Sequence, residues 1–163
     1  MARSGTDAAA ARAEAFLRIE PVVWLSTVSP DGRPHLVPIW FWWDGTSVLV
    51  ASKPNARKIA NLRLNPSCML AVGDAAADFD VALIEARAEL TSIPTRAVLD
   101  AGLFGKYRDR MLAIGLERDE FEATYSQVVR ITPNRCLPWR GRPQRPGFNR
   151  LAIAPNAFTA VSA

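Results

Sequence analysis

Residues 22–52, VVWLSTVSPDGRPHLVPIWFWWDGTSVLVAS, contain three runs of branched and aromatic residues separated by two short turns. The turns carry Pro30-Asp31-Gly32 and Asp44-Gly45, and such residues between β-rich runs are a strong short-range signal for hairpins. We therefore predict an antiparallel meander with strands near residues 22–28, 34–43 and 47–52.

Two prolines interrupt the second of these runs. Pro34 stands at its start and Pro38 lies inside it. Because proline donates no backbone hydrogen bond, it is confined to strand starts, edge strands and bulges. We expect an edge or bulged position for this strand and irregular backbone near Pro38.

The remaining patterns predict further strands and several helices. We expect strands at 67–74, 79–90 and 125–133, and helices at 7–19, 56–64, 94–101, 106–114 and 117–123, the last extending the one before it. Because the strands follow one another without a helix between each pair, the pattern favours a six-stranded antiparallel barrel over a doubly wound parallel sheet. From Asn134 the chain is rich in Pro, Arg and Gly, and we expect a loop or arm there, with residues 141–163 a flexible tail.

Composition favours one domain over residues 1–163. The chain is 49% hydrophobic, which is enough for a sizeable core, and its net charge of +4 is spread along the sequence. Two cysteines do not form a disulfide framework or a zinc motif, and no apolar run has the length of a signal peptide core or membrane span. We expect a cytoplasmic protein without a membrane, metal or nucleic-acid partner.

Arg57 and Lys58 stand where the strand pattern of residues 47–52 gives way to the helix pattern of 56–64. A helix start already carries unpaired N–H groups and the positive end of the macrodipole, so two cations there concentrate positive charge unless an anion binds. Arg offers a planar fork for phosphate oxygens, Lys a mobile point charge, and Ser52 a hydroxyl. The sequence predicts a phosphate cradle, although adjacent cations on a helix are also commonly just solvated.

The order of these features resembles the flavin-binding split β-barrel family of the pyridoxamine 5′-phosphate oxidase-like proteins. The resemblance rests on the strand and Asp-Gly turn succession, on Ser52 followed by Ala56-Arg57-Lys58, and on the short helix ending in Asn65-Pro66. It runs from about Trp24 to Leu90 and more loosely from Val128 to Trp139. It implies a mainly β, FMN-binding type of split barrel with helices, which forms a homodimer with two cofactor sites at the subunit interface.

The resemblance also assigns roles to residues of this chain. Arg57 and Lys58 would hold the cofactor phosphate, with the Ser52 hydroxyl and the Ala51 backbone, and Asn61 would support them one helical turn on. The cofactor ring would lie along the second strand, and part of each pocket would come from the partner chain. The ring contacts expected are Val37, Pro38, Ile39 and Trp40, and the contributions expected from the partner are Trp139 and Arg140.

Two stretches favour the deazaflavin F420 over FMN. Residues 31–40 match the pattern DGRPH-x-x-P-x-W, and residues 132–139 match TP-x-R-x-x-x-W, both similar to F420-dependent actinobacterial members. The C-terminal Arg-x-His stretch of the true pyridoxamine phosphate oxidases is missing, since the chain's one histidine is His35. The resemblance thus implies an oxidoreductase that passes hydride to or from a small conjugated or electron-poor molecule.

Two other classes of function stay open on the sequence. One is a non-catalytic carrier of flavin or haem, in which His35 would be the sole histidine able to ligate. The other is a basic β-barrel that binds single-stranded nucleic acid with its tryptophans as stacking platforms. Within the run Trp40 to Trp43 we expect core or interface packing, and Trp40 alone has a functional case.

Overall fold

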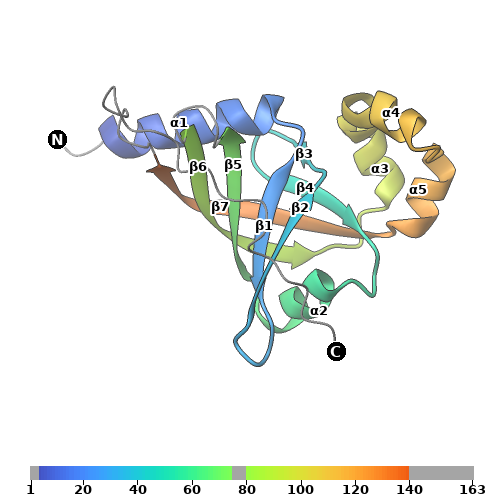
Figure 1. Cartoon of the computed structure of the whole chain (residues 1–163), viewed down its shortest axis with the longest axis horizontal. Coiled ribbons are helices and arrows are strands. Elements are labelled where there is room, and N and C mark those ends of the chain that lie inside the picture. Colours follow the sequence, from blue (N-terminus) through green and yellow to red (C-terminus); the bar gives the residue numbers. More distant parts are fainter. Residues whose placement is uncertain (1–3, 75–79, 140–163) are drawn as a thin grey trace, which may run out of the picture.

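The structure is a computed structural model that describes residues 4–74 and 80–139 of the chain (Figure 1). Its strands are β1 (Val23–Val28), β2 (Pro34–Ile39), β3 (Trp42–Trp43), β4 (Val48–Ser52), β5 (Ser67–Asp74), β6 (Asp80–Leu90) and β7 (Gln127–Trp139). Its helices are α1 (Ser4–Ile19), α2 (Arg57–Leu64), α3 (Thr95–Val98), the π-helical turn η1 (Leu99–Leu103), α4 (Phe104–Ala113) and α5 (Arg118–Thr124).

The strands form one sheet in the order β2-β1-β5-β6-β7-β4-β3, and every pair is antiparallel. The antiparallel half-barrel predicted from the sequence is therefore confirmed. The expectation of six strands is wrong, because the run predicted over residues 34–43 divides into β2 and β3. β2 pairs with β1 and β3 pairs with β4, so these two consecutive strands lie at opposite edges of the sheet.

The division falls at Trp40-Phe41, two residues after the predicted irregularity at Pro38. There the chain leaves the β1 ladder, and the backbone of Phe41 makes its hydrogen bonds with the Tyr107 hydroxyl instead. That oxygen accepts from the Phe41 N–H at 2.9 Å and lies 3.0 Å from the Phe41 carbonyl and 2.9 Å from the Pro21 carbonyl, either of which can accept its proton. Pro34 begins β2, which is an edge strand, as its missing N–H requires.

Two buried clusters hold the molecule together. The larger fills the barrel and includes Leu25, Ile84 and Ile131, with Phe16 and Leu17 of α1 packed on it. Figure 1 shows α1 lying across the upper edge of the sheet and α2 beside the sheet's lower part. The smaller cluster lies beneath a helical lobe, which we define as residues 95–124.

β7 is longer than the sequence indicated. It starts at Gln127 and pairs with β6 as far as Trp139, with one register shift at Glu85/Ala86. The loop expected from Asn134 is therefore wrong for residues 134–139, because the β6 ladder continues to supply hydrogen-bond partners despite the prolines. The tail predicted for residues 141–163 lies outside the described residues.

The gap predicted between residues 101 and 106 is reduced to a kink at Gly102, whose backbone is not helical. α3, η1 and α4 follow one another directly, and Gly102 inside η1 has a φ of 148°. A Cβ at Gly102 would overlap the Trp42 ring, so glycine lets the lobe approach β3 closely. In the part of the chain that is described, no helix combines the length and apolar character needed to cross a membrane.

Candidate functional site

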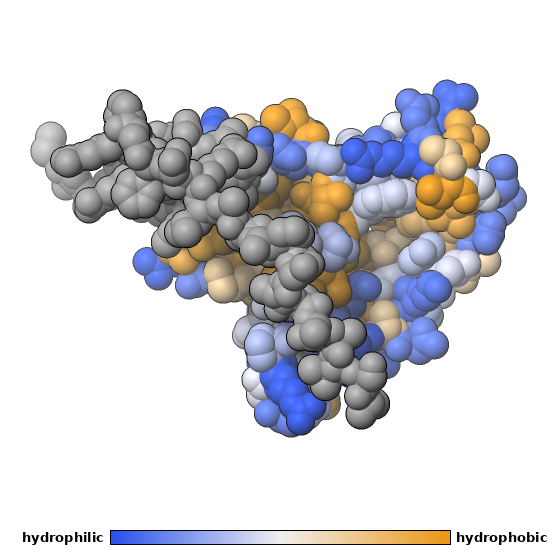
Figure 2. Space-filling model, viewed as in Figure 1, coloured by the Kyte–Doolittle hydropathy of each residue, from blue (hydrophilic) through white to orange (hydrophobic). Residues whose placement is uncertain are grey.

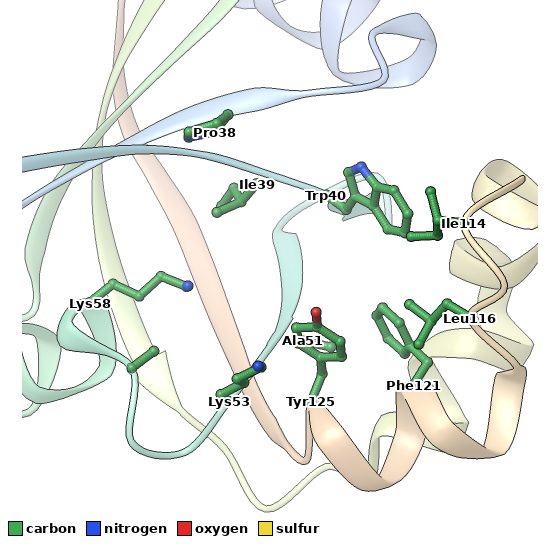
Figure 3. A pocket seen from close by; sticks show the side chains of 11 residues that line it. Pro38, Ile39, Trp40, Ala51, Lys53, Lys58, Ile114, Leu116, Phe121 and Tyr125 are labelled. Atoms are coloured by element: carbon green, nitrogen blue, oxygen red, sulfur yellow. The ribbon is translucent and has the colours of Figure 1, made fainter. Parts of the chain in front are cut away.

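A pocket of about 370 Å³ lies between the barrel and the helical lobe. Figure 2 shows the surface hollowed between these two parts, and Figure 3 shows the side chains that line the pocket. Its volume falls in the lower range of small-molecule sites, enough for one planar ring system. The lining residues are Pro38, Ile39, Trp40, Ala51, Lys53, Ala56, Lys58, Ile114, Leu116, Phe121 and Tyr125.

One end of the pocket, which we call the lysine end, carries Lys53 and Lys58. Figure 3 shows Lys58 at one side of the pocket and Lys53 between it and Tyr125, with Trp40 and Phe121 further away. Burial lowers the pKa of Lys58, because its ammonium is partly removed from water. Within residues 4–74 and 80–139, no carboxylate is within ion-pair distance of Lys53, Arg57 or Lys58. This end is therefore positively charged and offers donors to an anion.

The start of α2 adds to this charge. Ala56 is its N-cap residue with extended backbone, it makes no side-chain cap, and the first turn has no acidic residue. The free N–H groups and the dipole of this eight-residue helix thus point toward the loop that holds Lys53. Positive charge and free N–H groups therefore gather at this side of the pocket, with Lys53 as a cation that the sequence analysis did not name, and the phosphate cradle itself stays a prediction.

The opposite end, which we call the aromatic end, is built by four rings. The Trp40 ring lies 4.7 Å from the Tyr107 ring and 6.5 Å from the Phe121 ring between centroids, with interplanar angles of 10° and 13°. The Phe121 and Tyr125 rings are 4.6 Å apart. Tyr107 is buried behind Trp40, and burial raises the pKa of Tyr107 to about 12, so its hydroxyl keeps its proton for the backbone of Phe41 or Pro21.

Five of the residues predicted for the cofactor line this pocket: Pro38, Ile39, Trp40, Ala51 and Lys58. They come from the end of β2, the end of β4 and the start of α2, three segments that the fold brings to one mouth of the barrel. In the aromatic run, Phe41 is fully buried, and Trp42 and Trp43 pack on the two core clusters. Trp40 alone reaches the pocket.

Four other predicted residues are close by without lining it. Val37 packs on the barrel core. Ser52 is 1% exposed, and its hydroxyl makes only a long bond of 3.4 Å to the Lys53 carbonyl. Arg57 is exposed. The Ser29 hydroxyl is the chief cause that lowers the pKa of Asp31 in the β1–β2 turn, and the charge of Arg57 is a smaller one. The Arg57 charge therefore acts on this turn as well.

Asn61, predicted to support the phosphate cradle, is buried behind α2 and bonded to β1. Its side chain is 2% exposed and donates to the Thr27 hydroxyl at 3.0 Å. It therefore fixes α2 to β1 beneath the lysine end, and supports the anion site by position only.

Of the two residues expected from the partner chain, Trp139 stands apart from the pocket within this chain. β7 begins at Gln127 beside Ser52, and Trp139 ends it at the register of Val81. Trp139 is thus at the other end of a 13-residue strand, and Arg140 lies outside the described residues.

Sequence reasoning missed six lining residues: Lys53, Ala56, Ile114, Leu116, Phe121 and Tyr125. Lys53 and Ala56 could have been found, because both lie in the loop that leads from Ser52 to Arg57. Phe121 and Tyr125 are one helical turn apart on α5, a spacing that indicates a shared face but not what the face contacts. Across the described ranges, no group of three or more His, Cys, Asp or Glu side chains is placed to hold a metal ion.

An antiparallel half-barrel with a cationic helix start beside an apolar pocket defines a split β-barrel protein. The sequence profile of the pyridoxamine 5′-phosphate oxidase family matches residues 9–140, and the chain belongs to that family. Among curated proteins, none matches this chain in sequence.

Solved structures with the same fold bind different groups. An F420 reductase is 22% identical, with a TM-score of 0.61, and the match covers 76% of this chain and 94% of that one. An FAD-binding protein from Mesorhizobium loti is 18% identical (TM-score 0.59; 78% and 89% covered). HutZ, the heme storage protein from Vibrio cholerae, is 18% identical (TM-score 0.59; 78% and 93% covered). At these identities the likeness is one of fold.

Proposed function

We propose that this protein is an oxidoreductase that binds F420, or alternatively FMN, and transfers hydride to or from a small conjugated or electron-poor molecule. The observation that carries the proposal is the uncapped, cationic start of α2 at one end of a pocket whose other end is aromatic. A cofactor of this type has both parts that such a pocket fits, a phosphate and a flat ring.

The residues of the chain divide the work of binding. Arg57 and Lys58, with the free N–H groups of α2, hold the phosphate, and the end of β2 supports the ring. Ile114 and Leu116 add apolar lining on the side of the helical lobe. Bound there, the cofactor supplies the hydride chemistry, so no protein acid or base is required to activate it.

The preference for F420 rests on sequence similarity. Residues 31–40 and 132–139 match patterns of F420-dependent members, and an F420 reductase shares the fold. The FAD-binding neighbour keeps a flavin as the alternative. The same fold occurs in an F420 reductase and in an FAD-binding protein, so the titration described below decides between F420 and FMN.

We further propose that the protein acts as a homodimer with its cofactor sites at the interface. Large apolar side chains are exposed on one face of the sheet: Trp24 is 47% exposed, and Leu36 is 58% exposed. Leu36 and Met69 flank Ser26 on either side of β1, so with Trp24 they form one continuous face of β2, β1 and β5. We expect a second copy to cover this face, and sedimentation equilibrium measures the assembly.

The test is fluorescence titration with F420 and, separately, with FMN. We expect micromolar or tighter binding of F420 to the wild type, and at least a tenfold loss in the double variant Arg57→Ala/Lys58→Ala. Arg63→Ala is the matched control, because it removes a cation from the last turn of the same helix and should leave the affinity unchanged. Oxidation of reduced F420 by added quinones then measures turnover.

Two results would contradict the proposal. If neither cofactor binds the wild type at micromolar levels, the cations of α2 are merely solvated. If a cofactor binds tightly but no acceptor oxidises it, the protein is a carrier. A haem carrier is less well supported by the described residues, because His35 lies on β2 opposite Thr27 and does not line the pocket.

A further inference from the structure

A second cavity, of about 510 Å³, lies where the end of α1 meets β3 and the helical lobe. Figure 1 shows the end of α1 and this lobe next to each other at the upper edge of the molecule. The cavity shares no lining residue with the pocket of the candidate site. Its lining includes the apolar side chains Leu17 and Trp42 and the cations Arg18 and Lys106. Lys106 is therefore open to a small molecule that enters this cavity.

Lys106 lies on α4, and its ammonium packs against aromatic rings. Its Nζ is 3.6 Å from the centroid of the Phe41 ring and 5.5 Å from that of the Tyr107 ring. Both rings are buried, and Lys106 itself is half-buried. None of the ion pairs formed among residues 4–74 and 80–139 includes Lys106. Within these ranges the amine is thus partly removed from water, with no carboxylate in contact to hold its proton.

Three influences act on the protonation of Lys106. Burial is the largest and lowers its pKa to about 8, whereas Glu20 raises the pKa and Arg110 lowers it. Roughly a tenth of the amine is then uncharged at pH 7, against roughly one part in two thousand for an ordinary lysine. An uncharged lysine amine in apolar surroundings is a nucleophile. Lys106 can therefore attack an electrophilic carbonyl carbon that enters the cavity.

The other charged groups that line the cavity already have partners. Arg18 donates to Glu14 at 2.6 Å. Asp44 accepts from two backbone N–H groups of the turn that follows it, at 2.8 Å and 2.7 Å. Asp44 is therefore occupied within its own turn rather than with Lys106.

The surroundings of the Lys106 amine favour a neutral product. Addition of CO₂ would form a carbamate and place negative charge near Glu20 and against the electron-rich face of the Phe41 ring, and both contacts are unfavourable. An amide instead removes the partly buried charge and lets an acyl group contact the apolar lining of the cavity. Arg110, one helical turn from Lys106, adds positive charge for a donor that carries phosphate. These features favour acylation.

We propose that Lys106 is an acylation site, whose amine takes a small acyl group from a phosphate-bearing activated donor, either an acyl-coenzyme A thioester or an acyl phosphate. The lone pair of Nζ attacks the carbonyl carbon, an N–C bond forms, and the C–S or C–O bond to the leaving group breaks. The thiolate or phosphate leaves with the electron pair, and the amine proton passes to water. The inference does not depend on the proposed function, because the cavity is separate from the cofactor pocket.

The test is incubation of the wild type with acetyl-coenzyme A and, separately, with acetyl phosphate, from pH 7 to 10. The chain has three lysines, Lys53, Lys58 and Lys106, so chymotryptic digestion and mass spectrometry assign every acetylated lysine side chain. At pH 7 we expect Lys106 to react about fivefold or more faster than the exposed Lys53. The rate at Lys106 should rise with pH and level off above about pH 8, where most of its amine is uncharged.

Variants assign the reactivity to the surroundings of Lys106. Glu20→Gln removes the negative charge that raises the pKa of Lys106, so acetylation at pH 7 should become about twofold faster. Lys53→Arg is the matched control, because it removes another lysine, keeps the charge and should leave the rate at Lys106 unchanged. Lys106→Arg should abolish acetylation at this position while keeping the affinity for F420 within about twofold.

The outcomes decide the inference on its own. If Lys106 reacts no faster than Lys53 with either donor, its amine is not activated or not reachable, and the site is refuted. A rate at Lys106 that keeps rising to pH 10 would also refute it, because the amine would then titrate as an ordinary lysine. Fast reaction with one donor alone supports the site and identifies the class of donor.

Discussion

The two ends of the pocket are built in contrasting ways. The aromatic end is part of a core, with Tyr107 and Phe121 buried and the Tyr107 hydroxyl bonded to backbone. The lysine end is open and collects positive charge at a helix start where charge of that sign is unfavourable. The rings of the aromatic end therefore contribute to the folded core, whereas the cations at the start of α2 lower stability unless an anion binds there, as the proposed function requires.

The largest effect should come from breaking the aromatic end. Tyr107→Ala removes a buried ring and three hydrogen-bonding contacts, and we expect the free energy of unfolding to fall by about 3–5 kcal/mol. Urea denaturation followed by tryptophan fluorescence measures it. Tyr107→Phe keeps the ring and strands the Phe41 N–H, so it should lose about 1–3 kcal/mol. Equal stability of wild type and Tyr107→Phe would show that water replaces the hydroxyl and that this end is not fixed through it.

The next effect concerns the support beneath the lysine end. Asn61→Ala removes the buried donor to Thr27, and we expect a loss of about 1–2 kcal/mol in stability. In a double-mutant cycle with Thr27→Val, the two changes should be non-additive, because each removes the same hydrogen bond. Additive losses would mean that the bond contributes nothing, and a selective loss of F420 affinity at full stability would restore Asn61 to the cofactor site.

Removing two cations from the start of α2 should change the free energy of unfolding in the opposite direction. In Arg57→Ala/Lys58→Ala, we expect unfolding free energy to stay the same or rise by about 0.5 kcal/mol, since positive charge leaves the positive end of the dipole. Arg63→Ala, in the last turn, should instead lose a few tenths, because a cation there is favourable. Thermal denaturation in low-salt buffer compares the three proteins. A marked loss of stability in the double variant would show that these cations have structural partners.

The smallest effect is a pH dependence behind the aromatic end. Lys106 has its Nζ 3.6 Å from the centroid of the Phe41 ring, and burial lowers its pKa to about 8. Glu20 raises the pKa and Arg110 lowers it further. The unfolded chain then binds more protons than the folded one between pH about 8 and the ordinary lysine range, so this group's contribution to stability rises with pH across that window.

Lys106→Met tests this dependence, because it keeps the apolar stem and removes the titrating group. The difference in unfolding free energy between wild type and variant, measured from pH 7 to 10, should shift in favour of the wild type as pH rises. A flat difference would show that Lys106 titrates normally and that its ammonium remains in water.

The antiparallel half-barrel and the helix predicted over residues 56–64 could be inferred from local sequence patterns and are confirmed, whereas the anion site at the start of that helix stays a prediction. These features follow from local chemistry: Asp-Gly turns between β-rich runs, a proline-ended helix and cations without acidic neighbours. The chain segments that carry them are close in sequence, so their geometry depends little on distant residues. The resemblance to a known family drew on the same segments. The residues that it named there, Lys58 and residues 38–40, line the pocket.

The aromatic end and the break between β2 and β3 depend instead on contacts between residues far apart in the sequence. Tyr107 is 66 residues from Phe41, and its hydroxyl is what lets the chain leave one edge of the sheet and join the other. Phe121 and Tyr125 show helical periodicity, but periodicity states only that they share a face. What that face meets is fixed when the lobe packs on β4 and Trp40, a long-range contact that no local pattern in the sequence encodes.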